Sequence, residues 1–179
     1  MCNNTKQKIA ATLRQMMTKR PFDKITVTNL MDATNMQRQS FYYHFQDTRD
    51  VLMWICREEL FKPLAESDLE FIEWTLYGLQ LLESDRAFFR RVVNASFEEF
   101  SRELSKQAVF SRVAAMIYSR IPAQNLNENQ QFVVSVVTTA TVDFLLHFAM
   151  DHQPLDTELV RQKLMFLFRE LKIGSYAAP

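Results

Sequence analysis

The chain has 179 residues, of which 47% are apolar and only two are glycine. This composition excludes a disordered or fibrous protein, and the scarcity of glycine favours long helices over short strands joined by turns. The formal net charge is zero, but residues 1–50 carry eight basic and four acidic side chains, against thirteen and seventeen in the remainder. A basic N-terminal part suits contact with a polyanion, although an imbalance of this size also arises by chance.

The first three predicted elements are helices near the N-terminus. Apolar residues recur at helical spacing across residues 6–19, which predicts an amphipathic first helix. Thr26 stands where an N-cap is needed, before a second helix of about two turns at residues 27–33. Asn35 tolerates the left-handed conformation of a tight turn, and a third helix is predicted at residues 38–45.

The rest of the chain is also predicted to be helical. Asp47 caps a fourth helix at residues 48–61, and the polar run after Pro63 indicates a break. Ser96 and Glu99 have the spacing of a capping box at the start of a long helix. The later helices are predicted at residues 69–82, 86–94, 97–120, 128–151 and 157–172.

This pattern predicts an all-α fold of about nine helices in two parts. A three-helix module at residues 1–50 precedes a larger helical domain at residues 51–179, and the boundary falls within the fourth helix. The two short helices at residues 27–33 and 38–45 have the size of a helix-turn-helix.

The third predicted helix has one apolar side and one polar side. Phe41 and Phe45 lie one turn apart and are expected to anchor the helix inward. Every outward residue can hydrogen-bond and none is acidic: Gln37, Arg38, Gln39, Ser40, Tyr42, Tyr43 and His44. Such a face suits the major groove of double-stranded DNA, because Arg reads guanine, Gln reads adenine, and Ser and Tyr reach phosphates. The alternative is an ordinary solvated helix face.

The segment Ser40-Phe41-Tyr42-x-His44-Phe45, with Ile25-Thr26-Val27 upstream, closely resembles the DNA-binding signature of the TetR family of transcriptional regulators. The resemblance covers about residues 6–55. The short body that follows resembles the branch that includes dihydroxyacetone-kinase regulators. The resemblance implies a repressor that binds a palindromic operator as a homodimer.

The family pattern also assigns roles to residues of this chain. It places base reading at Gln37, Arg38, Gln39 and Tyr43, and phosphate contacts at Thr26, Tyr42, His44 and Thr48. Three positions depart from the pattern. The usual turn glycine is Asn35, the usual capping serine is Gln37, which is a poorer cap, and the usual phosphate-binding lysine is Thr48.

The last two predicted helices are apolar over more than one stripe each, so we expect them to pair with their twofold mates in a homodimer. The alternative is that they fill the core of a single chain. The expected contact residues are Phe132, Val133, Val136, Val137, Ala140, Phe144, Phe148, Leu159, Val160, Leu164, Phe166, Leu167, Phe168 and Leu171.

The middle helices are rich in aromatic residues, and in the TetR family these helices enclose an effector pocket. A small apolar effector is expected there, and a coregulator protein docked on the body is the other possibility. The residues concerned are Trp54, Phe61, Trp74, Tyr77, Phe88, Phe100, Phe110, Tyr118 and His147. The alternative for each is plain core packing. The fourth helix, which carries Trp54, is expected to couple the pocket to the DNA-binding module.

An enzyme is the main competing class, and the sequence offers no chemistry for it. There is no paired Glu-x-x-His motif for a di-metal site and no glycine-rich phosphate loop. Asp143 and His147, spaced i and i+4, could contact a ligand or form a structural polar pair. A helical interaction module without DNA contact would leave the polar face of residues 37–44 unexplained.

Cys2 and Cys56 have no metal-type spacing and form no disulfide framework, which is typical of a reduced, cytoplasmic protein. We expect no cofactor, no bound metal and no membrane contact. The most apolar stretch, residues 132–150, is interrupted by polar residues and is predicted to be a buried helix of a soluble protein.

Overall fold

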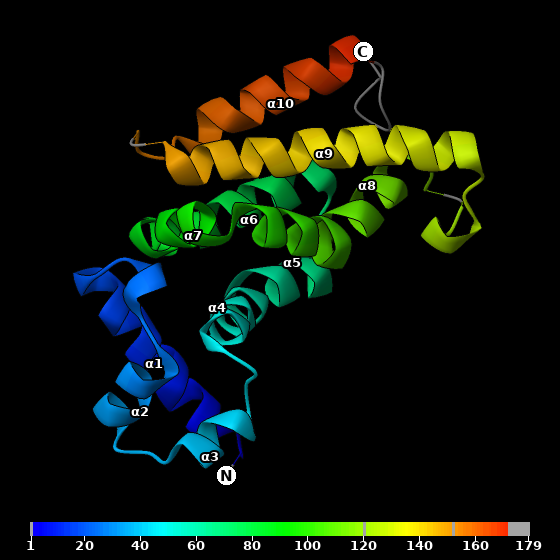
Figure 1. The fold of residues 1–179 in the computed structure, drawn as a ribbon. Helices are drawn as coiled ribbons and strands as arrows, with labels where there is room; N and C mark the ends of the chain where they lie inside the picture. Colours follow the sequence, from blue (N-terminus) through cyan, green and yellow to red (C-terminus); the bar gives the residue numbers. More distant parts are fainter. Residues whose placement is uncertain (1, 120, 152, 172–179) are drawn as a thin grey trace.

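The computed structural model of the protein describes residues 2–119, 121–151 and 153–171, and every regular element in these ranges is helical (Figure 1). The predicted all-α fold is confirmed. The helices are arranged in three groups. The N-terminal helices lie at one end, a middle layer follows, and the two long C-terminal helices lie at the other end (Figure 1).

The N-terminal module contains α1 (Cys2–Lys19), a short 3₁₀ turn η1 (Phe22–Lys24), α2 (Val27–Thr34) and α3 (Arg38–Tyr42). Helix α1 begins four residues before the predicted start. Its buried residues Ile9, Leu13 and Met17 are spaced four apart, so one stripe of α1 packs on the core.

Local signals fix the ends of α2 as predicted. The Thr26 hydroxyl accepts a hydrogen bond from the Asn29 backbone N–H (3.2 Å), and the Asn29 side chain accepts one from the Thr26 N–H (3.1 Å). Asn35 follows the helix with φ 53° and ψ 45°, the left-handed conformation that asparagine tolerates better than most residues. The turn therefore forms without the glycine usual in the family pattern.

The fourth helix is longer than predicted. It runs through α4 (Thr48–Cys56), a π-helical segment η2 (Arg57–Phe61) and α5 (Lys62–Glu66). The Lys62 N–H bonds to the Arg57 carbonyl, five residues back, directly before Pro63. Because proline has no N–H to donate, the wider turn lets the helix pass the position where a break was expected.

The middle layer contains α6 (Phe71–Ser84) and a long helix made of α7 (Arg86–Leu104), a π-helical segment η3 (Ser105–Val109) and α8 (Phe110–Ile117). After a short turn η4 (Ala123–Asn125), the last described elements are α9 (Glu128–Met150) and α10 (Thr157–Leu171). The predicted end of the last helix at residue 172 lies outside the described residues.

The predicted boundary between residues 94 and 97 is a kink and not a break. Ser96 has non-helical φ −151° and ψ 43° inside α7, and its buried hydroxyl has no hydrogen-bond partner in the described structure. The expected capping box with Glu99 is therefore absent. Val92 and Val93 before the kink and Phe100 after it are buried, so both halves of α7 pack on the core.

One apolar core extends from Ile9 in α1 to Phe168 in α10. Trp74 of α6 is fully buried in it, and its indole N–H donates to the Leu64 carbonyl at 2.9 Å. Gly78 lies on the same helix and faces the side chains of Leu64 and Leu145. The core is continuous between the N-terminal module and the body.

Cys56 of α4 is fully buried, and its burial raises the pKa of the thiol well above the ordinary value, with a further contribution from the charge of Glu59. Because the thiolate is the reactive form, we predict that Cys56 in a Cys2→Ser variant does not react with Ellman's reagent at pH 8 in the native state. About one thiol per chain should react after unfolding in guanidinium. Rapid reaction of the native protein would contradict this placement of α4.

Candidate nucleic-acid interface

The helical turn of α3 continues beyond its last α-helical residue. The Tyr43 N–H donates to the Gln39 carbonyl (3.2 Å), and the Phe45 N–H donates to the Phe41 carbonyl (2.9 Å). Residues 38–45 therefore form the compact helical segment that the sequence predicts, with an irregular last turn.

Two aromatic rings fix this segment in place. Phe41 is fully buried, and its ring centroid lies 5.9 Å from that of Phe45. The Phe45 ring meets Trp54 of α4 edge-on at 6.0 Å. The orientation of α3 is thus tied directly to the helix that enters the body.

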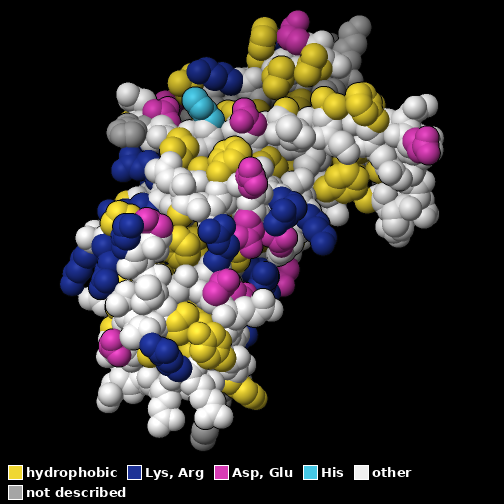
Figure 2. Space-filling view, in the orientation of Figure 1, with side chains coloured by type: hydrophobic (Ala, Val, Ile, Leu, Met, Phe, Trp, Pro, Cys, Tyr) yellow, Lys and Arg dark blue, Asp and Glu magenta, His cyan; other side chains and the backbone are white. Residues whose placement is uncertain are grey.

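The anchoring of Phe41 and Phe45 turns the polar residues outward. Tyr42 is 60% exposed and Tyr43 is 79% exposed, which is unusual for large aromatic side chains. Gln37, Arg38 and Gln39 are also exposed, while Ser40 and His44 are half-buried. The structure brings together all seven residues of the predicted polar face, at an end of the molecule where few acidic side chains are visible (Figure 2).

Arg38 is held by a residue that the sequence analysis did not single out. Its Nη2 donates to the hydroxyl of Thr28, on the neighbouring helix α2, at 2.6 Å. Thr28 follows the capping residue Thr26 by two positions, and only the folded arrangement of α2 and α3 brings it to Arg38.

The two remaining predicted contact residues lie at helix starts. Thr26 is exposed, and because its hydroxyl oxygen accepts the capping bond, its proton stays available for another acceptor. Thr48 is half-buried at the first position of α4. Asp47 caps that helix as predicted, since its side chain accepts from the Asp50 N–H at 2.8 Å. Gln37 makes no capping bond, as its chemistry predicts.

The predicted effector residues do not form one open chamber. Phe61, Trp74, Phe88 and Phe100 are buried, and the Phe61 and Phe100 rings pack 5.3 Å apart. Trp54, Tyr77, Phe110 and Tyr118 are half-buried. None of these residues lines the cleft at the end of α1 or the groove between α6, α9 and α10, and their role in effector binding stays a prediction.

His147 is exposed on α9, as is Asp143, so this pair lies on the surface and not in a pocket. Their side chains make no hydrogen bond with each other in the described structure. In the described part of the chain, no three His, Cys, Asp or Glu residues gather as a metal site would require.

Comparison with known proteins supports a regulator. No protein-family model matches the chain. The chain is 27% identical over 101 residues to the HTH-type dhaKLM operon transcriptional activator DhaS of Lactococcus lactis subsp. lactis (strain IL1403). The match covers 54% of this chain and 54% of that relative, so it spans about half of the relative's length.

A solved structure of a dihydroxyacetone kinase operon activator, DhaS, shares the fold. It superposes with a TM-score of 0.61 at 18% identity, covering 96% of this chain and 98% of the other. Both relatives are named as transcriptional activators, and neither is an enzyme. These names agree with the branch that the sequence resembles.

Proposed function

We propose that the protein is a DNA-binding transcriptional regulator that reads a palindromic operator as a homodimer. The observation that carries the proposal is the outward face of residues 37–44, which is polar, free of acidic residues and anchored from behind by Phe41. The curated relative, named as a transcriptional activator of an operon, supports the same function. Such a regulator would act on double-stranded DNA in the cytoplasm.

The roles of individual residues follow from their chemistry. Gln37, Arg38, Gln39 and Tyr43 would meet base edges in the major groove, with Arg38 aligned by Thr28. Residues with hydroxyl or imidazole groups would contact phosphates. These are Thr26, Ser40, Tyr42, His44 and Thr48. We leave repression out of the proposal, because the curated relative is named an activator.

The dimer is proposed from uncovered apolar surface on α9 and α10. The prediction that residues 132–150 are buried is wrong for a single chain, since Phe132 is 70% exposed and Val136 54%. On α10, Phe166 is 58% exposed. Helix α9 is long and apolar enough to cross a membrane, and about a third of its apolar stretch is buried.

A second copy of the chain is the occupant that we propose for this surface. Helices α9 and α10 lie at the same end of the molecule, where they would meet their twofold mates in a four-helix bundle (Figure 1). An apolar groove of about 460 Å³ runs between α6, α9 and α10. An isologous pairing would cover it and place the two α3 helices on the same side of the dimer.

Control by a small effector or a coregulator protein is also proposed, with α4 as the connecting element. Trp54 of α4 contacts Phe45 at the end of the helical segment of residues 38–45. The helix that begins with α4 continues to Glu66 in the body. A ligand that binds more tightly when α4 is in one position than in another would shift the protein toward that position. The affinity for the operator would then change by at most the ratio of the ligand's affinities for the two positions.

We predict that Arg38→Ala weakens binding to an operator selected by the wild-type protein from random duplexes. Loss of one bidentate base contact should cost about 1–3 kcal/mol, and discrimination at one base position should relax. Arg102→Ala, which removes an exposed arginine from α7, is the matched control and should bind as wild type. Fluorescence anisotropy of labelled duplex gives both affinities. Unchanged binding by the Arg38 variant would exclude α3 as the reading helix.

We predict that the protein has twice the 21.1 kDa mass of one chain when measured by light scattering at micromolar concentration. Phe166→Asp should yield monomers, because it places a charge in the proposed interface. The matched control is Phe97→Asp, at an exposed phenylalanine on α7. A monomeric wild type would contradict the dimer, and wild-type partitioning into lipid vesicles would assign the apolar face to a membrane.

A further inference from the structure

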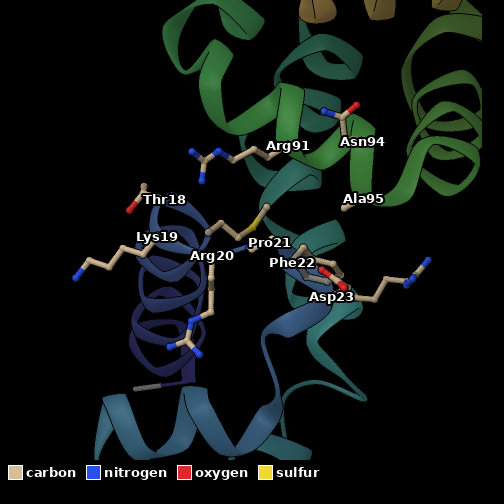
Figure 3. A pocket seen from close by; sticks show the side chains of 11 residues that line it. Thr18, Lys19, Arg20, Pro21, Phe22, Asp23, Arg91, Asn94 and Ala95 are labelled. Carbon is tan, nitrogen blue, oxygen red and sulfur yellow. The ribbon is translucent and has the colours of Figure 1, made fainter.

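A cleft of about 640 Å³ lies between the N-terminal module and the body, away from both α3 and the α9–α10 surface. One wall is the end of α1 with η1, residues 17–23, and the other is α7 at Arg91, Asn94 and Ala95 (Figure 3). Arg49, at the start of α4, completes the lining. Neither the proposed DNA contact nor the proposed dimer uses this cleft.

The charges around the cleft are almost all positive. Lys19, Arg20, Arg49 and Arg91 line it, and its one acidic residue, Asp23, is already paired with Lys24 at 3.4 Å. Within the described structure Lys19, Arg20 and Arg91 form no ion pair. Arg49 has one, with Glu99 at 3.9 Å, the limit for such a contact.

The fold explains two of these cations but not the other two. Lys19 and Arg20 end α1, where positive charge offsets the partial negative charge of the last carbonyls. Arg49 is the second residue of α4, where the helix dipole favours negative charge. Arg91 has only Ala87, Phe88, Asn94 and Ala95 at helical neighbour positions, so no acidic residue of its own helix faces it.

The floor of the cleft is apolar. Met17 is buried and Phe22 is half-buried, and Pro21 and Ala95 add further carbon surface. Figure 3 shows the Arg91 side chain reaching from α7 toward the end of α1 that carries Thr18, while the side chains of Lys19 and Arg20, both exposed, point away from Arg91. A ligand with an apolar body and an anionic group matches this combination.

We propose that this cleft binds a small organic phosphate ester, with the phosphate between Arg91 and the Lys19–Arg20 end of α1 and the organic part on Met17 and Phe22. A phosphate monoester carries nearly two negative charges at pH 7, and arginine binds such groups in bidentate geometry. The volume lies within the range of small-molecule sites.

The proposal also assigns a means of regulation, and this part rests on the proposed DNA-binding function. The phosphate would touch α1 of the N-terminal module and α7 of the body at the same time. A ligand that bridges the two favours the one placement of the module that closes the cleft. Ligand binding and operator binding are then coupled, and each changes the affinity of the other by the same factor.

The test is calorimetric titration of the full-length protein with phenyl phosphate, with benzyl alcohol as the neutral probe. We expect one phenyl phosphate per chain and little or no binding of benzyl alcohol. Lys19→Gln with Arg91→Gln should weaken phenyl phosphate about tenfold or more, because one cationic contact is lost on each side of the phosphate. The matched control, Lys62→Gln with Lys106→Gln, removes two exposed charges elsewhere and should keep wild-type affinity.

Three results would overturn the site: no binding of phenyl phosphate, equal loss in both double variants, or equal binding of benzyl alcohol. Operator affinity measured with and without phenyl phosphate then tests the coupling. It should change in the wild type and in the control variant but not in the Lys19–Arg91 variant, and an unchanged wild-type affinity would overturn the coupling. A protein that binds no DNA would refute the proposed function, while the calorimetry would still decide the site.

Discussion

A single chain of this protein has more apolar helix surface than it can cover. Helix α9 buries Val134, Leu145 and Leu146 against its own chain and leaves a second apolar side exposed, and α10 buries only Phe168 fully. Water in contact with this surface is unfavourable at roughly 25 cal/mol per Å². The proposed twofold partner would remove that cost, and the twofold axis would then fix how the two α3 helices are presented to DNA.

The N-terminal module is linked to the body at points that could transmit a change. Phe45 meets Trp54 of α4, and α4 runs without interruption into α5. Arg14 of α1 pairs with Glu59 in η2 and with Asp85, the N-cap of α7, and its guanidinium lies 4.0 Å from the centre of the Phe88 ring. The proposed anion cleft lies between the same two parts of the chain, where a ligand would add a further link.

Features set by local chemistry could be predicted from the sequence. The caps at Thr26 and Asp47 and the left-handed turn at Asn35 depend on residues within three or four positions, and all three form as expected. The outward face of α3 follows from the spacing of Phe41 and Phe45. The helix continues past Ser96 through a kink and past Pro63 through a wider π-helical turn, and the sequence pattern predicted a break at both places. The cleft beside the end of α1 could not be predicted from the sequence, because its lining comes from three separate stretches of the chain.

The central claim is that pairing through α9 and α10 presents two α3 helices to one duplex. Hydroxyl-radical footprinting of a selected operator tests it most directly. The account predicts two protected segments related by a twofold axis, with centres about 10–10.5 base pairs apart or a multiple of that spacing. Phe166→Asp should abolish the paired footprint. A single protected segment, or two arranged head to tail, would contradict the account.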